Sequence, residues 1–73
     1  MTSLTRYDAA CAALAAAVKA DEVMQVHVEA RAIEAVGRVA QNIELEVQAR
    51  TLRTRAEARL GDMIKEGERL GIV

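Results

Sequence analysis

Apolar side chains recur along the chain at intervals of three and four residues, which is the period of an α-helix. The first segment with this pattern has one apolar face, made of Tyr7, Cys11, Leu14 and Val18. Most of its other positions are alanine, the residue with the highest helix propensity. Thr5, with Asp8 three residues later, matches a helix-capping signature. We therefore predict a first helix over residues 5–19.

A second segment is apolar on more than one side. Its main stripe consists of Val23, Val26, Ala30, Ile33, Gly37 and Ala40, and this stripe is widened by Val36, Val39 and Ile43. The polar strip opposite is narrow and consists of His27, Arg31, Glu34, Arg38 and Gln41. Asp21 is a favourable N-cap for this helix, which we predict over residues 21–40. Because its apolar surface is so wide, we expect it at the centre of the fold.

Two features near the end of this segment determine how the chain continues. Gly37 lies inside the predicted helix, where glycine costs about 1 kcal/mol relative to alanine. We expect it to mark a close approach between two helices, with a kink as the alternative. Asn42 is a favourable cap for a third helix, predicted over residues 43–66. The alternative is one continuous helix over residues 21–66.

The third segment carries an apolar seam with nearly the seven-residue repeat of a coiled coil. Its members are Leu45, Ala49, Leu52, Ala56, Leu60 and Met63. The seam is shorter than the three or four heptads that a coiled-coil prediction requires. Gly67 is expected to end the helix as its C′ glycine and to leave a short tail over residues 67–73.

These elements predict a single all-α domain over residues 1–73, a three-helix hairpin or bundle. Fifteen of the 73 residues are alanine, and the chain has no phenylalanine, tryptophan or proline, so its core contains little bulk. Domains of this size rarely gain more than about 3–5 kcal/mol from a core alone. A single cysteine excludes an internal disulfide, so we expect self-association into a homodimer or higher oligomer. The residues expected to carry it are Val36, Val39, Ile43, Leu45, Leu52 and Leu60.

Charge and hydropathy narrow the functional classes. Ten basic and eleven acidic residues give a net charge of −1, which disfavours a nucleic-acid partner because such proteins usually show a basic excess. No stretch approaches the roughly 20 apolar residues of a membrane span, so no membrane association is expected. The single thiol and the absence of a signal-peptide pattern favour a reducing cytoplasm.

Few residues are candidates for catalysis or metal binding. His27 lacks a second metal ligand three or four residues away, and we read it as a solvated helix residue. Cys11 lies on an apolar face and is read as a small hydrophobic residue. No nucleophile is paired with a base, and no glycine-rich phosphate loop is present. We therefore expect no enzymatic activity, no metal and no cofactor.

Binding is the remaining class of function. The exposed residues expected to contact a protein partner are Tyr7, Arg31, Glu34, Arg38, Arg55 and Arg59. Tyr7, the only aromatic residue, either packs at the helix edge or anchors that contact. The densest basic cluster consists of Arg50, Arg53, Arg55 and Arg59. Four acidic partners at helical spacing, in the pairs Glu46–Arg50, Arg53–Glu57, Arg59–Asp62 and Glu66–Arg69, favour a solvated helix with ion pairs over a DNA-binding helix.

A resemblance adds a possible origin. The stretch from Arg53 to Ile64, RTRAEARLGDMI, resembles an "RxRAExRLGxxI" segment of uncharacterised helical proteins from bacteriophages, prophages and other mobile elements. The sequences DEV at residues 21–23 and NIELE at residues 42–46 fall where such proteins have "DEV" and "xELE". The resemblance covers about residues 7–66. It implies a helical module of phage-like origin in a bacterial host, and it carries no established activity.

Three functional hypotheses follow. The first is a non-enzymatic helical interaction module that binds a larger host or phage complex, for example as an anti-CRISPR-like inhibitor. The second is a DNA-associated accessory or regulatory protein that uses the arginines of the third helix. The third is an oligomerisation segment of a larger assembly.

Overall fold

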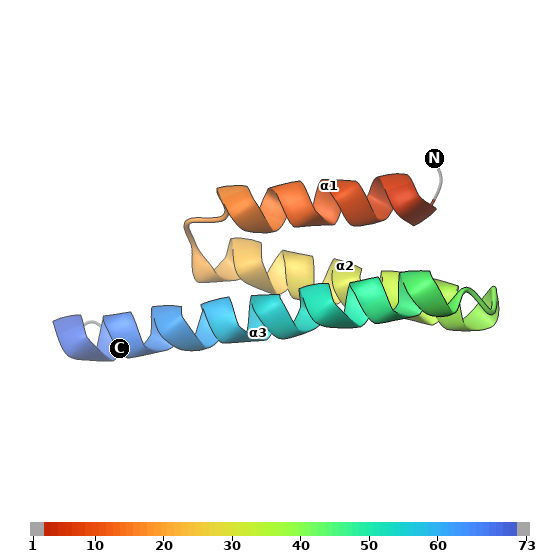
Figure 1. The fold of residues 1–73 in the computed structure, drawn as a ribbon. Coiled ribbons are helices and arrows are strands. Elements are labelled where there is room, and N and C mark those ends of the chain that lie inside the picture. The colour runs from red at the N-terminus through yellow and green to blue at the C-terminus, as the bar shows by residue number, and fades with distance from the viewer. Residues whose placement is uncertain (1–2, 72–73) are drawn as a thin grey trace.

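The chain folds into three antiparallel helices that run up, down and up again. A computed structural model describes residues 3–71, with side chains from residue 5 onward. Its helices are α1 (Ser3–Ala16), α2 (Ala20–Val39) and α3 (Ile43–Leu70), and no strand occurs among the described residues. The predicted all-α class is therefore confirmed. In Figure 1, α3 extends past the loop between α1 and α2, so the C-terminal part of α3 projects beyond the other two helices.

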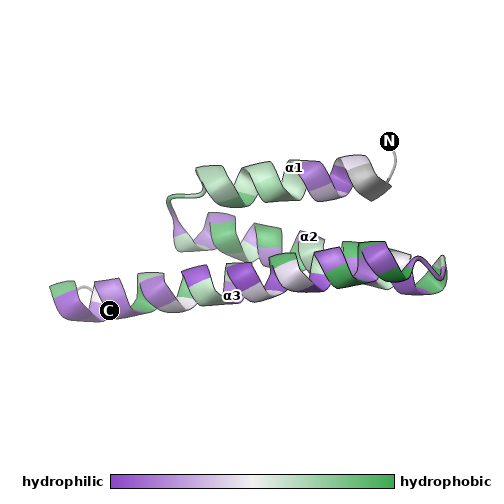
Figure 2. Ribbon diagram, viewed as in Figure 1, coloured by the Kyte–Doolittle hydropathy of each residue, from purple (hydrophilic) through white to green (hydrophobic). Residues whose placement is uncertain are grey.

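α2 is the central element, as its wide apolar surface predicted. It packs most extensively against α3 and less extensively against α1, whereas α1 and α3 make few contacts with each other. The molecule is consequently thin and elongated, with extents of 45 × 18 × 13 Å. Figure 2 shows that most of α1 is uniformly apolar, which reflects its alanines.

The ends of the helices correct two predicted caps and one predicted helix end. α1 begins at Ser3, so Thr5 lies inside it and does not cap it. α2 is preceded by Lys19, and Asp21 lies in its first turn. Glu22 reaches back to accept hydrogen bonds from the backbone N–H groups of Lys19 and Val18 at 3.0 and 3.3 Å. The Glu22 carboxylate therefore caps α2 at Lys19, earlier than the predicted cap at Asp21. Separately, α1 ends at Ala16 and does not extend to residue 19 as predicted.

The break between α2 and α3 occurs where it was predicted, which excludes one continuous helix. Asn42 caps α3, because its side-chain oxygen accepts a hydrogen bond from the backbone N–H of Leu45 at 3.1 Å. Gln41 adopts the left-handed conformation with φ 57°. The N–H of Asn42 donates to the carbonyl of Gly37 at 2.8 Å, and that of Gln41 donates to Arg38 at 3.1 Å. These two bonds form a Schellman motif.

The far end of α3 differs from the prediction. Gly67 does not end the helix; it is buried within it, and α3 continues to Leu70. Gly71 is the terminating residue, with φ 75° and a hydrogen bond from its N–H to Glu68. Gly67 and Gly71 fit a C′ position equally well by sequence, but only Gly71 adopts the left-handed conformation among the described glycines. Part of the predicted tail is thus helical, and Ile72 and Val73 lie outside the described residues.

The core is a single layer of small side chains between the helices. Its buried apolar residues are Ala10, Ala17, Val23, Val26, Ala30, Ile33, Leu45, Ala49, Leu52 and Ala56. Half of them are alanine, and only Ile33, Leu52 and Val23 are large and fully buried. The expected shortage of core bulk is confirmed for the described residues.

Gly37 marks a close approach of α2 and α3, as predicted. A Cβ atom at this position would lie 2.8 Å from the backbone nitrogen of Glu46 and 3.2 Å from the carbonyl oxygen of Asn42. Both are backbone atoms, so they cannot rotate away. The absence of a side chain therefore allows α2 and α3 to pack this closely at the turn.

Two residues expected to carry self-association belong to the core of the single chain. Leu45 and Leu52 are buried against α2, because the heptad-like seam of α3 finds its partner within the same molecule. Leu60 and Val36 are half-buried, and Leu60 packs against the core. Val39 and Ile43 remain exposed, at 85% and 74%. No helix within residues 3–71 is long and apolar enough to cross a membrane.

Candidate functional site

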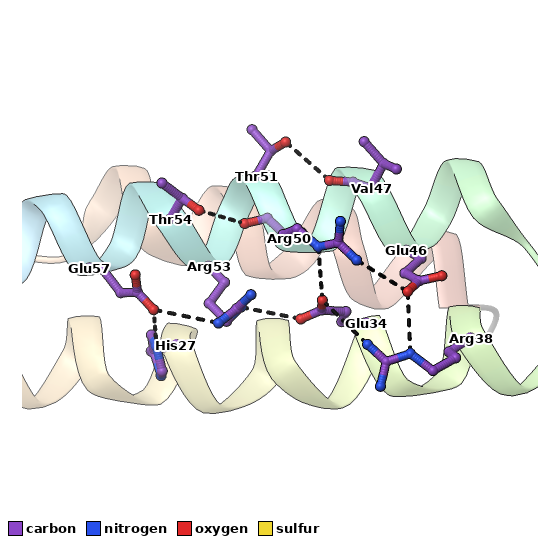
Figure 3. Close-up of polar contacts among 10 residues, drawn as sticks. All are labelled: His27, Glu34, Arg38, Glu46, Val47, Arg50, Thr51, Arg53, Thr54 and Glu57. Atoms are coloured by element: carbon purple, nitrogen blue, oxygen red, sulfur yellow. Dashed lines mark hydrogen bonds and ion pairs between the residues drawn. The ribbon is translucent and has the colours of Figure 1, made fainter.

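The most organised polar feature is an ion-pair network along the seam between α2 and α3 (Figure 3). Its members come from both helices: His27, Glu34 and Arg38 from α2, and Glu46, Arg50, Arg53 and Glu57 from α3. Antiparallel packing brings these residues together across the seam, on the side of the α2–α3 layer where α1 does not pack. We refer to this set as the seam network.

Glu34 is the centre of the seam network and is the only buried charged side chain among the described residues. Its carboxylate lies 3.1 Å from Nε of Arg50, 3.2 Å from Nε of Arg53 and 3.7 Å from Arg38. Burial alone would raise the pKa of Glu34. The hydrogen bond from Arg50 and the positive charges of Arg53, Arg50 and Arg38 outweigh burial, and the pKa of Glu34 is lowered. The carboxylate is therefore held ionised.

Glu46 and Glu57 extend the network in the two directions along the seam. Glu46 accepts hydrogen bonds from Arg38 at 3.3 Å and from Arg50 at 3.2 Å. Glu57 lies 3.7 Å from Arg53 and 3.0 Å from Nε2 of His27. The three arginines and three glutamates of the network balance each other, so the seam carries no net charge from them.

Two sequence predictions need correction at this seam. Glu34 was expected on the exposed surface as a partner contact, but it is buried and bound by three arginines. Arg38 remains largely exposed, yet it is engaged with Glu34 and Glu46. His27 was read as solvated, but its side chain is only 22% exposed and contacts Glu57. Spacing within one helix could show only the Glu34–Arg38 pair, because the other partners come from α3.

A sequence signal for the seam network did exist. Glu46, Arg50, Arg53 and Glu57 follow each other at steps of four, three and four, parallel to the apolar seam of α3. His27 and Glu34 are seven residues apart beside the apolar stripe of α2. Such positions flank a helix–helix interface and commonly form ion pairs across it. Pairing the two helices about Gly37 and Glu46 would have predicted these contacts.

The predicted ion pairs within α3 are formed in part. Glu46–Arg50, Arg53–Glu57 and Glu66–Arg69 are present, whereas Arg59 and Asp62 form no ion pair among the described residues. One further pair joins α1 to α2, in which Arg6 contacts Glu29 at 2.7 Å. Sequence reasoning missed this pair because its two residues are far apart in the chain.

A second surface lies between α1 and α3 and contains three of the residues predicted to contact a partner. We call it the α1–α3 face. It consists of Tyr7, Cys11 and Leu14 of α1, Val18 in the loop after α1, and Arg55 and Arg59 of α3. Tyr7, Cys11 and Leu14 are half-buried against the core, whereas Val18 is 76% exposed. Arg59 lines an open groove of about 480 Å³ with Val18 and Met63.

Tyr7 connects the two helices of this face electrostatically. A side-chain hydrogen bond with Cys11, followed by burial, raises the pKa of Tyr7, and the positive charge of Arg55 opposes this effect. The phenol is consequently protonated at neutral pH and can donate a hydrogen bond. Arg55 is exposed and forms no ion pair within residues 5–71, and the same is true of Arg59. Arg31 is also exposed and unpaired there, but it lies on α2 and away from this face.

The described residues contain no cluster of three metal-ligating side chains, and Cys11 is a free thiol. No protein-family model matches the chain, and no curated protein or solved structure shows significant similarity to it.

Proposed function

We propose that this protein is a non-enzymatic helical interaction module that binds a larger protein through the α1–α3 face. One observation carries the proposal: Arg55 and Arg59 are exposed and unpaired in the described structure, whereas Arg38, Arg50 and Arg53 are engaged in the seam network. Unpaired arginines beside a tyrosine and an exposed aliphatic side chain have the composition of a protein-binding surface.

The chemistry of the α1–α3 face indicates the partner it would bind. Two arginine side chains one helical turn apart favour carboxylates, to which guanidinium groups donate paired hydrogen bonds. Leu14 and Val18 provide an apolar strip alongside them. An acidic segment with interspersed aliphatic side chains would complement both features.

The resemblance to phage and mobile-element proteins supports a bacterial host or phage complex as the target class. An anti-CRISPR-like inhibitor is one form of this proposal, because such a protein acts by covering a surface on a larger machine. Cytoplasmic location and absence of catalytic activity belong to the same proposal.

The alternative, a DNA-associated role for the arginines of α3, has weaker support. Arg50 and Arg53 are neutralised by glutamates, so two of the four clustered arginines are not free to contact phosphate. Retention on DNA at low salt, lost steeply as salt rises, would favour this alternative.

Capture from a bacterial lysate by the tagged chain, followed by mass spectrometry, tests the proposal. Arg55→Glu and Arg59→Glu should each reduce capture of the specific partner by about tenfold or more, because each places a carboxylate against an acidic surface. Lys65→Glu is the matched control, since Lys65 is exposed on α3 away from this face. Equal capture by all variants, or capture of nucleic acid only, would contradict the proposal.

A further inference from the structure

α2 has an apolar outer face that is largely exposed. It consists of Val28, Ala32, Ala35 and Val39, which follow each other at steps of four, three and four. Val28 is 61% exposed and Val39 is 85% exposed. Between them, Ala35 is exposed and Ala32 is half-buried. We call this set the α2 outer face. All four residues are apolar, so their exposure to water is energetically unfavourable.

The exposed area of the whole chain is larger than its mass predicts. A folded monomer of 7.9 kDa should expose about 4,400 Å². This chain exposes 5069 Å², which is roughly 650 Å² more. Each partner in a stable dimer of standard size buries about 800 Å². The excess is therefore close to what one copy would bury in such a dimer.

The order of residues on the α2 outer face reads the same in both directions, as valine, alanine, alanine, valine. We infer that this face binds a second copy of the chain, with the two α2 helices antiparallel about a two-fold axis. In this register Val28 lies opposite the partner subunit's Val39, and Ala32 lies opposite the partner subunit's Ala35. A two-fold axis requires such self-complementarity, because each copy presents the same surface.

The size of the side chains fits this arrangement. Two alanines at the centre allow the helix axes to approach closely, and valines at both ends fill the space where the helices diverge. Beside this face, an open groove of about 630 Å³ runs between α1 and α2. Ala9, Ala13 and Ala16 line its α1 side, whereas Glu22, Gln25 and Glu29 line most of its α2 side. The alanines of the groove give the second copy further apolar surface on α1.

This inference rests on the proposed function only in treating the chain as a protein-binding module. It names a second copy of the chain as the partner of the α2 outer face. The two surfaces are separate, since the α1–α3 face remains free when the α2 outer faces are paired. Each can therefore be substituted without altering the other.

Sedimentation equilibrium over a range of concentrations tests the inference. The wild-type chain should form a dimer, and Ala35→Glu should weaken dimerisation by at least about tenfold, because it places two like-charged carboxylates beside the two-fold axis, where they would lose water. Ala35 is exposed in the single chain, so the variant should retain its helicity. Ala12→Glu is the control, since Ala12 is exposed on α1, outside both this face and the residues that line the groove.

Disulfide cross-linking in a Cys11→Ala background tests the antiparallel register. Val28→Cys chains mixed with Val39→Cys chains should form mixed disulfides, because these positions lie opposite each other. Two copies of position 28 would be about 16 Å apart along the axis, beyond the roughly 7 Å between Cα atoms that a disulfide spans. The inference would be overturned if the chain is a monomer at every concentration or if Ala35→Glu leaves dimerisation unaffected. Disulfides that form only between like positions would also overturn it. If Arg55→Glu abolishes capture of the larger partner but leaves dimerisation intact, the dimer surface and the proposed partner-binding surface are distinct.

Discussion

Glu34 shows how a buried charge is accommodated at the level of a single residue. The side chain is 10% exposed, and such a carboxylate is destabilising unless opposite charges and hydrogen bonds compensate for its lost hydration. Three arginines supply that compensation, and two of them come from the neighbouring helix. Glu34 therefore links α2 to α3 through charge as well as through packing.

The pH dependence of stability follows from the lowered pKa of Glu34. Its folded pKa lies below the unfolded value of about 4.3, so its contribution is fully present above that pH and is lost as pH falls through the folded pKa. We predict that Glu34→Gln lowers the free energy of unfolding at neutral pH by about 1–2 kcal/mol, a low value because two of the arginines are half-exposed or more.

Urea denaturation of both proteins between pH 7 and pH 3 would measure this effect. The difference between wild type and Glu34→Gln should shrink as the pH falls below about 4. Glu68→Gln, at an exposed position without an ion pair among the described residues, should match wild type throughout. A constant difference at all pH values would show that the charge of Glu34 is not responsible.

At the scale of elements, the helices and their central break were predictable from sequence because their signals are local. The apolar stripe of α2 and the Asn42 cap depend on residues within one or two turns. The true end of α3 was not predictable, since Gly67 and Gly71 have the same local propensity and only Gly71 adopts the left-handed conformation that ends the helix. The seam network was likewise missed because its pairs depend on how two helices are aligned.

The contact between α2 and α3 at Gly37 gives a prediction in which packing opposes helix propensity. Gly37→Ala should destabilise the fold by about 1–3 kcal/mol, although alanine favours helix by about 1 kcal/mol, because its Cβ would overlap the backbone of Glu46. Gly61→Ala is the matched control, since a Cβ there meets nothing within 4 Å. It should stabilise the fold by up to about 1 kcal/mol.

Thermal unfolding followed by circular dichroism would compare the two glycine variants under identical conditions. Shifts of opposite sign are expected, with Gly37→Ala unfolding at the lower temperature. Stabilisation by both alanines would mean that α2 and α3 do not approach closely at this point.

At the scale of the whole molecule, the dominant property is a thin shape with a small core. Three helices bury ten apolar side chains among the described residues, and half of these are alanine. Large apolar side chains remain exposed on α2, on α3 and in the loop after α1, including Val28, Val47 and Val18. A single copy therefore leaves much apolar surface in water, and association with another protein would cover part of it.

Thermal unfolding as a function of protein concentration tests most directly whether the fold is completed by a second copy. Stability that depends on dimerisation rises with concentration, so the midpoint should increase by roughly 5–10 °C over a hundredfold range. The midpoint of Ala35→Glu should be low and independent of concentration. A wild-type midpoint that is equally independent of concentration would contradict the account.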